Sequence, residues 1–189
     1  MLYLLAKNPD KQEKLRQEIF NILPTKDTAL TDDKLKHIPY LRACMKEANR
    51  CYSVASGMAR ETGQNLVLNG YRIPKGTNLL MTTKLLMQDD KYFKRAKEFI
   101  PERWVRDESY KTEGCPHAKE THPFIYLPFG FGSRSCIGQR FAELEVTTFI
   151  IRLLREFEVS WHHADLKVKS TIVDTLIGDM KFKLKELNH

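Results

Sequence analysis

The sequence has no apolar run approaching the roughly 18 residues that a membrane-spanning helix requires. Its opening segment, Met1 to Ala6, is too short for the apolar core of a secretory signal and lacks both a basic start and a small-residue cleavage site. We expect this segment to be the end of a helix whose beginning is missing. The opening therefore indicates a fragment of a longer protein. The sequence as a whole shows no internal repeats, low-complexity segments or inter-domain linker.

Cysteine is also scarce. The four cysteines (Cys44, Cys51, Cys115 and Cys136) show no regular spacing, which argues against a disulfide framework and favours reduced thiols. The sequence lacks any block of lysine and arginine, although its formal net charge is +7. Basic residues alternate with acidic ones and have no aromatic register of the kind that nucleic-acid modules use, so we expect no nucleic-acid partner. An acidic protein partner fits the charge better.

What the sequence does contain is typical of a globular protein. Apolar residues make up 42% and charged residues 29% of the 189 positions, which speaks against disorder and suits one domain. Apolar periodicity predicts helices near residues 9–22, 40–51 and 138–156. In the last of these, Phe141, Leu144, Phe149, Leu153 and Phe157 lie near one face, which predicts an amphipathic helix.

Short strands are predicted between these helices and after them. Asn69-Gly70 tolerates positive φ at both positions and predicts a tight β-hairpin between residues 65–68 and 71–73. A further strand is expected at 78–82. Short strands are also expected at 166–168 and 180–185, around a turn at Gly178. The fold class is therefore mainly helical with small β-sheets (α+β).

Residues 89–135 show little periodicity but many turn residues and aromatics. An irregular stretch of this length in a compact domain is usually functional. It contains the Pro101-Glu-Arg-Trp104 segment, whose Arg103 could reach an acidic group elsewhere. On the helix before it, Glu47 and Arg50 are spaced i and i+3 and can pair. Either feature alone would be read as an ordinary loop or surface ion pair, but a carboxylate between two arginines would pin the coil to the helix.

The segment from Phe129 to Gly138 is the most informative. Gly130 and Gly132 permit positive φ and a close approach of the backbone to a flat ligand. Cys136 precedes the predicted 138–156 helix, whose first N–H groups suit a thiolate. Arg134 could reach a carboxylate of that ligand, and Phe129 could pack beside it. A dinucleotide site is a poorer interpretation because Ser135 stands where the third glycine should be. A buried, inert cysteine would not explain the arginine and the glycines.

Phe129-x-x-Gly-x-Arg-x-Cys-x-Gly138 resembles the haem-binding signature of the cytochrome P-450 family at every fixed position. Glu47-x-x-Arg50 and Pro101–Trp104 resemble the other two landmarks of that family, in the same order and at about the same spacing. The resemblance covers essentially the whole chain and implies that residues 1–189 are the C-terminal part of a single cytochrome P450 domain. Ser53 departs from the proline that is common after the second landmark, which affects only the local chain path.

The resemblance implies a role for each matching residue. Cys136 would ligate the iron of haem b through a thiolate that favours O–O cleavage, a role that general treatments of haem ligation assign to this family. Arg134 and Arg60 would pair with the haem propionates, and Glu47, Arg50 and Arg103 would form a structural triad. Phe129, Gly130, Gly132 and Gly138 would shape the haem-binding loop. The expected substrate-facing residues are Val54, Ala55, Ser56, Met58, Leu176 and Ile177.

Charged residues near these motifs favour one branch of the family. Arg42 and Lys46, four residues apart on the predicted 40–51 helix, and Arg140 could face the cysteine side of the haem, although a solvated helix face is the alternative. With Arg103-Trp104 and Ala142–Glu145, they resemble the animal mitochondrial class. That class takes electrons from an adrenodoxin-type ferredoxin and, with O2, hydroxylates sterols, steroids, ecdysteroid precursors or other lipophilic compounds. We therefore expect the matrix face of the inner mitochondrial membrane, the alternative being the endoplasmic reticulum with an NADPH-dependent flavin reductase.

Several expectations follow from the missing first half. No oxygen-activating residue can be assigned, any membrane contact would be made by the full-length protein, and the 189 residues alone should bind haem poorly and be inactive. A truncated, non-catalytic gene product is one alternative. A zinc module using Cys115, His117, His122 and Cys136 is another, but its ligand spacing is unusual.

Overall fold

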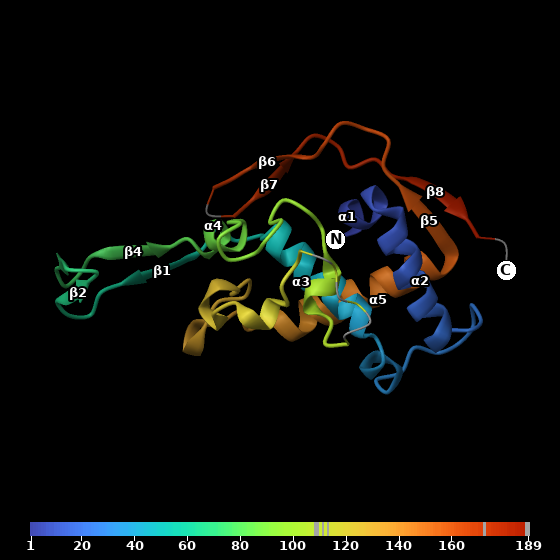
Figure 1. The fold of residues 1–189 in the computed structure, drawn as a ribbon, viewed down its shortest axis with the longest axis horizontal. Coiled ribbons are helices and arrows are strands. Elements are labelled where there is room, and N and C mark those ends of the chain that lie inside the picture. The colour runs from blue at the N-terminus through green and yellow to red at the C-terminus, as the bar shows by residue number, and fades with distance from the viewer. Residues whose placement is uncertain (108–109, 111, 113, 172, 188–189) are drawn as a thin grey trace.

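The computed structural model describes residues 1–107, 110, 112, 114–171 and 173–187. Helices form its centre, and pairs of short antiparallel strands lie around them (Figure 1), which confirms the predicted α+β class. The α-helices are α1 (Leu2–Lys7), α2 (Pro9–Ile22), α3 (Pro39–Cys51), α4 (Thr83–Met87) and α5 (Gln139–Glu156). The 3-10 helices are η1 (Lys34–Lys36), η2 (Pro101–Trp104), η4 (Ala118–Glu120), η5 (Pro123–Ile125) and η6 (Gly132–Arg134).

The strands pair two by two. The pairs are β1 (Met58–Glu61) with β4 (Asn78–Met81), β2 (Leu66–Leu68) with β3 (Tyr71–Ile73), β5 (Phe157–Ser160) with β8 (Lys183–Glu186), and β6 (Lys167–Lys169) with β7 (Thr175–Ile177). The β1–β4 ladder carries the β2–β3 hairpin away from the helices as a projecting arm (Figure 1). At the predicted turn, Asn69 has φ 49° and Gly70 φ 84°, so both residues adopt the positive φ that this hairpin requires.

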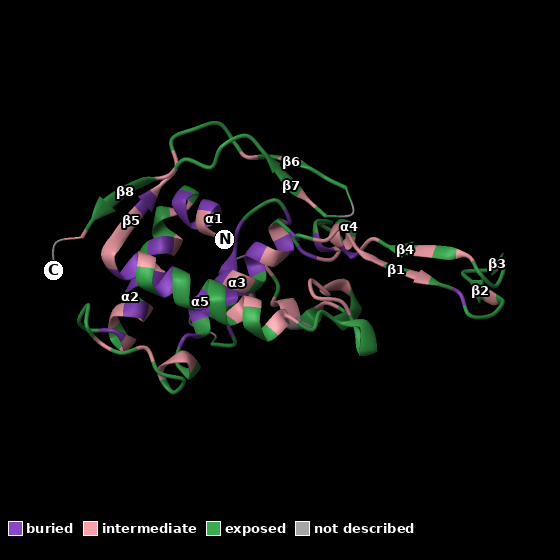
Figure 2. Cartoon of the chain, turned by 180° about the vertical axis from the view of Figure 1, so that it is seen from behind, coloured by how far each residue is buried: buried purple, intermediate pink, exposed green. Residues whose placement is uncertain are grey.

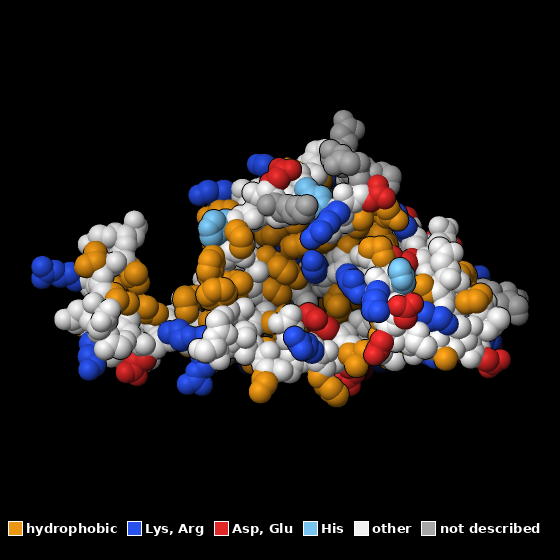
Figure 3. Space-filling model, turned by 90° about the horizontal axis from the view of Figure 1, so that it is seen from below, with side chains coloured by type: hydrophobic (Ala, Val, Ile, Leu, Met, Phe, Trp, Pro, Cys, Tyr) orange, Lys and Arg blue, Asp and Glu red, His pale blue; other side chains and the backbone are white. Residues whose placement is uncertain are grey.

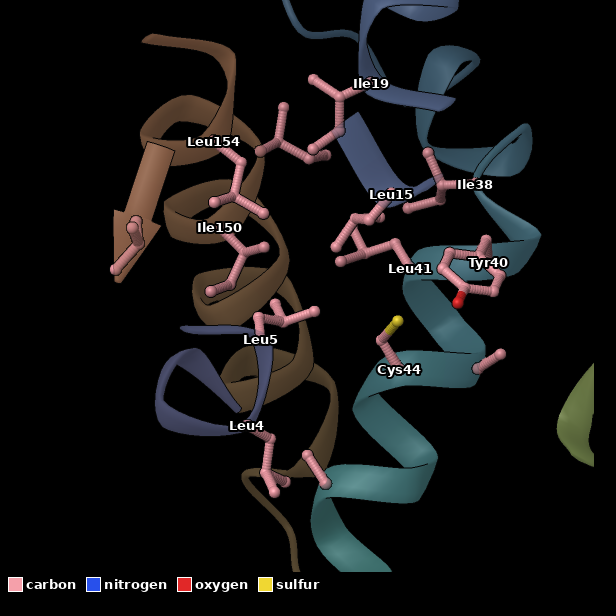
Figure 4. Packing of buried hydrophobic residues seen from close by; sticks show 14 of the residues in the cluster. Leu4, Leu5, Leu15, Ile19, Ile38, Tyr40, Leu41, Cys44, Ile150 and Leu154 are labelled. Carbon is pink, nitrogen blue, oxygen red and sulfur yellow. The ribbon is translucent and has the colours of Figure 1, made fainter. Parts of the chain in front are cut away.

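The hydrophobic core lies where α1, α2, α3 and α5 meet (Figure 4). Leu5, Leu15, Leu41 and Leu154 are fully buried there, and Ile150 is 2% exposed. Each such side chain contributes about 1.5–3 kcal/mol to folding through removal of its surface from water. Figure 2 shows the buried residues concentrated in these helices, whereas the β1–β4 arm is mostly exposed or half-buried. The core thus holds α3 and α5, the two helices that carry the predicted site.

Polar side chains of α2 form hydrogen bonds with the backbone of β5 and of the first turn of α3. Gln12 donates to Val159 O at 2.8 Å and accepts from Val159 N at 2.9 Å, so α2 is tied to β5. The Glu18 carboxylate accepts from the backbone N–H groups of Tyr40 and Leu41 at 2.7 and 2.8 Å. These N–H groups have no partner within their own helix, because they lie in its first turn. Glu18 therefore caps α3 from a neighbouring helix.

Much of the predicted apolar face of α5 does not meet the core. Phe141, Leu144 and Phe149 are 72%, 50% and 55% exposed, whereas Ile150 and Leu154 are buried. Helix α5 is apolar on more than one side, and periodicity alone does not say which side meets the core. The Phe141 side of α5 remains open in this chain.

The C-terminal strands were only partly predicted. Strands β6 and β8 lie near the expected positions, but β5 and β7 were missed, and Leu176 and Ile177 lie in β7. Helix α4 was not expected either. Each of these elements is too short to show a periodic pattern. Within the described part of the chain, no helix combines the length and the apolar character needed to cross a bilayer.

Candidate functional site

The loop from Phe129 to Cys136 is closed by its own backbone. The N–H of Cys136 donates to Phe129 O at 2.8 Å, and the N–H of Ser135 donates to Gly132 O at 3.0 Å. Gly130 and Gly132 have φ values of 79° and 71°, which side chains rarely permit. The closed loop presents the exposed side chain of Cys136 two residues before Gly138, the N-cap of α5.

The glycines also leave space beside the sulfur. A Cβ at Gly138 would lie 3.9 Å from the Cys136 Sγ, and a Cβ at Gly130 would lie 3.1 Å from the Met58 Sδ. Around Gly132, no described atom lies within 4 Å of such a Cβ. A side chain at Gly130 would therefore crowd Met58, whereas a Cβ at Gly138 would only touch the sulfur and the Gly132 side of the loop is open.

Glu47, Arg50 and Arg103 meet in the interior, not at the surface as an ordinary ion pair would. The side chains of Glu47 and Arg50 are fully buried, and that of Arg103 is 1% exposed. Arg50 Nε and Nη2 donate to the two Glu47 oxygens at 2.9 Å each, and Arg103 Nε donates to Glu47 Oε1 at 3.0 Å. Burial alone would lower the pKa of Arg50, but the hydrogen bonds with Glu47 and the negative charge of Glu47 together outweigh burial and raise it.

The remaining donors of the two arginines bind the irregular coil. Arg50 Nη1 donates to Met87 O and Ala96 O at 2.9 and 2.7 Å, and Arg50 Nη2 donates to Glu98 O at 2.9 Å. Arg103 Nη1 donates to Lys94 O at 3.1 Å. A single buried cluster on α3 and η2 therefore fixes the backbone of residues 87–98.

The three predicted partner-facing cations lie together. Arg42 and Lys46 of α3 and Arg140 of α5 line one pocket of about 510 Å³, which Phe129 and Gly130 also line. All three cations are exposed. On the face shown in Figure 3, lysines and arginines border a hollow beside exposed apolar side chains. The loop that carries Cys136 and the cationic residues thus belong to one surface.

Arg60 lies near the other side of the loop. It lines a pocket of about 380 Å³ with Met58, Phe124 and Phe131, and its Nη1 donates to Ala59 O at 2.7 Å. Arg134 is exposed. Met58 packs against Gly130 and so does not join the other predicted substrate-facing residues.

The other segments predicted to face the substrate approach each other. Ala55 forms a bridge with Val173, and the N–H of Asp174 donates to Val54 O at 2.8 Å. Ser56 Oγ donates to Thr171 O at 2.6 Å. Val54 and Leu176 line the same pocket of about 270 Å³, while Ile177 is exposed at the end of β7.

The zinc alternative finds no support. Among the described residues, there is no group of three or more His, Cys, Asp or Glu side chains that could hold a metal ion. His117 Nε2 instead contacts Val105 O. The four predicted zinc ligands are therefore not brought together.

Comparison with known proteins agrees with this geometry. A family model described as "Cytochrome P450" matches residues 1–185. The chain belongs to the cytochrome P450 family. Probable mitochondrial cytochrome P450 12b2 of Drosophila melanogaster is 51% identical over 98% of this chain and 35% of its own length. Cytochrome P450 CYP12A2 of Musca domestica is 47% identical over 100% of this chain and 36% of its own length. The chain thus spans about a third of these relatives.

Cytochromes P450 are haem-dependent monooxygenases, and their cofactor is haem b. The residues present fit that cofactor. Cys136 is an exposed sulfur donor, and Phe131 of the same loop is a 58% exposed aromatic side chain that suits a flat apolar ring. Arg60 and Arg134 offer guanidinium groups for two carboxylates. This cytochrome P450 chain therefore carries a donor set of the right chemistry.

Sequence reasoning missed two groups that support the site. Trp104 Nε1 donates to Glu47 Oε2 at 2.7 Å, although the residue was noted only as part of a landmark. Glu102 Oε1 accepts from Tyr40 Oη, Lys11 Nζ and Lys14 Nζ at 2.9, 3.1 and 3.3 Å. The second network joins α2, α3 and η2, which lie far apart in the sequence. No local pattern could have indicated it.

Proposed function

We propose that these residues form the haem-ligating part of a mitochondrial cytochrome P450 that inserts one oxygen atom of O2 into a lipophilic substrate. The observation that carries this proposal is the exposed Cys136 in a closed glycine loop at the start of α5. The buried Glu47 cluster on the adjacent helix braces the region. When bound through a thiolate, haem supplies the activation of O2.

The protein side chains have positioning roles in this proposal. Cys136 supplies the iron ligand, and Arg134 and Arg60 neutralise the propionates. Helix α5 directs its positive end toward the sulfur. The residues that activate oxygen and cover the other face of the haem belong to the remainder of the protein, since the chain spans about a third of its relatives. We therefore expect the 189 residues alone to be inactive.

Replacing the sulfur ligand tests the proposal. In the full-length, haem-loaded enzyme, Cys136→Ser should abolish the carbonyl difference band near 450 nm and oxidation activity. Cys115→Ser is the matched control, because Cys115 lies outside the loop and should leave the band intact. A Cys136→Ser enzyme with an unaltered Soret spectrum and normal oxidation would refute the assignment.

An acidic, adrenodoxin-type ferredoxin is the proposed electron donor. Arg42, Lys46 and Arg140 surround one pocket beside the Cys136 loop, and complementary charge would steer an acidic partner to this surface. Reversing Arg42 and Lys46 to Glu should raise the KM for ferredoxin about tenfold and leave the 450-nm band unchanged, because two negative charges at the rim repel an acidic partner. Arg72→Glu, at the tip of the arm, should change neither. Unchanged ferredoxin kinetics, or faster reduction by a flavin reductase, would contradict this donor.

An apolar pocket and the names of two relatives support a substrate class and a location. Val54 and Leu176 line a mostly apolar pocket, which suits a sterol-, steroid- or ecdysteroid-like substrate or a lipophilic foreign compound. The relatives 12b2 and 12c1 from Drosophila melanogaster are named as mitochondrial proteins, which supports the matrix face of the inner membrane. Protease treatment of intact mitochondria should spare the enzyme, and digestion before the membranes are opened would contradict this location.

A further inference from the structure

Trp104 adds a donor to the buried Glu47 cluster. Its indole N–H donates to Glu47 Oε2 at 2.7 Å, the shortest contact that this carboxylate makes among the described residues. The other donors are Arg50, Arg103 and the N–H of Ile100 at 2.9–3.0 Å. An indole N–H is a donor only, and a phenylalanine at this position would offer none. Glu47 therefore fixes the position of the Trp104 ring.

The ring of Trp104 contacts the segment that leads into the Cys136 loop. The centroids of Trp104 and Tyr126 lie 4.5 Å apart, with their planes tilted by 50°. Tyr126 stands three residues before Phe129, and its hydroxyl donates to Lys46 O on α3 at 3.1 Å. Aromatic pairs in this distance range contribute about 0.5–1.5 kcal/mol beyond their buried area. Trp104 thus lies between Glu47 and the loop.

The two arginines of the cluster serve another segment. Apart from Glu47 and Cys51, the described hydrogen bonds of Arg50 and Arg103 go to carbonyls of residues 87–98. Neither arginine makes a described hydrogen bond to residues 126–136. The direct side-chain route from Glu47 toward the Cys136 loop therefore runs through Trp104 and Tyr126.

We infer that Trp104 is a positioning residue that transmits the fixed location of Glu47 to the Cys136 loop through Tyr126 and so keeps the sulfur ligated to the haem iron. This inference rests on the proposed function. Its consequence is selective. Loss of the indole N–H loosens the loop before it loosens the fold, because the arginines still hold Glu47 and the irregular coil.

The experiment uses the full-length, haem-loaded enzyme in its ferrous carbonyl form. Trp104→Phe keeps a ring against Tyr126 and removes the N–H. At a fixed sub-denaturing guanidinium concentration, the 450-nm band of this variant should convert to a 420-nm band about tenfold faster than in the wild type. A tenfold change corresponds to about 1.4 kcal/mol, which is about what loss of a hydrogen bond to a charged group costs. The far-UV circular dichroism should decay at the wild-type rate. Trp104→Ala should convert faster still, and if it does not load haem the Phe variant carries the test.

Trp161→Phe is the matched control. The indole of Trp161 donates to Ala164 O at 3.1 Å within its own turn, so this variant should keep the wild-type conversion rate. Conversion of Trp104→Phe at the wild-type rate would overturn the inference, as would parallel loss of the 450-nm band and the circular dichroism. A wild-type enzyme without any 450-nm band would instead refute the proposed function.

Discussion

Replacement of Arg103 by Met tests how much the buried cluster contributes to stability. The variant removes the hydrogen bonds to Glu47 Oε1 at 3.0 Å and to Lys94 O at 3.1 Å. Removing one partner of a buried pair costs about 3–5 kcal/mol when the remaining charge is left unpaired. Here Glu47 keeps Arg50, so the cost should lie at the lower end, about 3 kcal/mol. That value corresponds to roughly a 150-fold change in the folding equilibrium.

The assay is urea unfolding of the full-length enzyme, followed by far-UV circular dichroism, with the midpoint shift converted through the wild-type slope. Arg95→Met is the matched control. Arg95 pairs with Glu98 at 2.6 Å, but these side chains are 41% and 52% exposed, so the variant should shift the unfolding midpoint far less than Arg103→Met does. Equal midpoints for the Arg103 and Arg95 variants would refute the reasoning, because burial would then have no effect on how much an ion pair contributes to the free energy of unfolding.

Three further predictions concern other groups. Burial alone would raise the pKa of Glu102, but hydrogen bonds from its own backbone, Tyr40 and Lys11 outweigh burial and lower it. The folded state therefore stabilises the ionised Glu102 carboxylate. The free energy of unfolding lost in Glu102→Gln should be large at pH 7 and shrink below about pH 4, as measured by urea unfolding at both pH values. A loss that is the same at both pH values would contradict this. Burial raises the pKa of Cys51 to about 12. Alkylation of Cys51 by iodoacetamide at pH 8, followed by mass spectrometry, should therefore be at least about a hundredfold slower than that of free cysteine, and it should speed up as the pH rises. Rapid labelling at pH 8 would refute the burial of this thiol. Lys84 and Asp174 form an ion pair with side chains 14% and 9% exposed, which holds α4 against the segment after β6. Asp174→Asn should therefore weaken binding of a lipophilic azole about tenfold in a spectral titration while the 450-nm band persists; unchanged binding would contradict this link.

Local chemistry accounts for most of what could be predicted from the sequence. Asn69-Gly70 determines its hairpin through two positive φ values, and the helices at 9–22 and 40–51 follow from apolar spacing and an initial proline. The motif from Phe129 to Gly138 likewise contains its own glycines, its sulfur and the start of α5. Each of these features depends on residues that are close together in the chain.

The unpredicted features depend on distant partners. Strand β5 exists because Val159 pairs with Leu184 and because Gln12 of α2 binds its backbone. The burial of Glu47 and the contact of Trp104 with it depend on the packing of η2 against α3, and the open face of α5 depends on which side the core covers. None of these partners is marked by a spacing within the elements concerned.

The segment that follows α4, residues 88–98, shows how a site can be rigid without periodic structure. Buried carbonyl groups need hydrogen-bond donors, and helices or strands usually supply them. Here the guanidinium groups of Arg50 and Arg103 supply them to Met87, Ala96, Glu98 and Lys94. Because the cluster holds two positive charges and one negative, these carbonyl dipoles also stabilise its excess charge. The arginines and the coil therefore satisfy each other, which explains why a segment without sequence periodicity holds a fixed path beside the helix that bears Glu47.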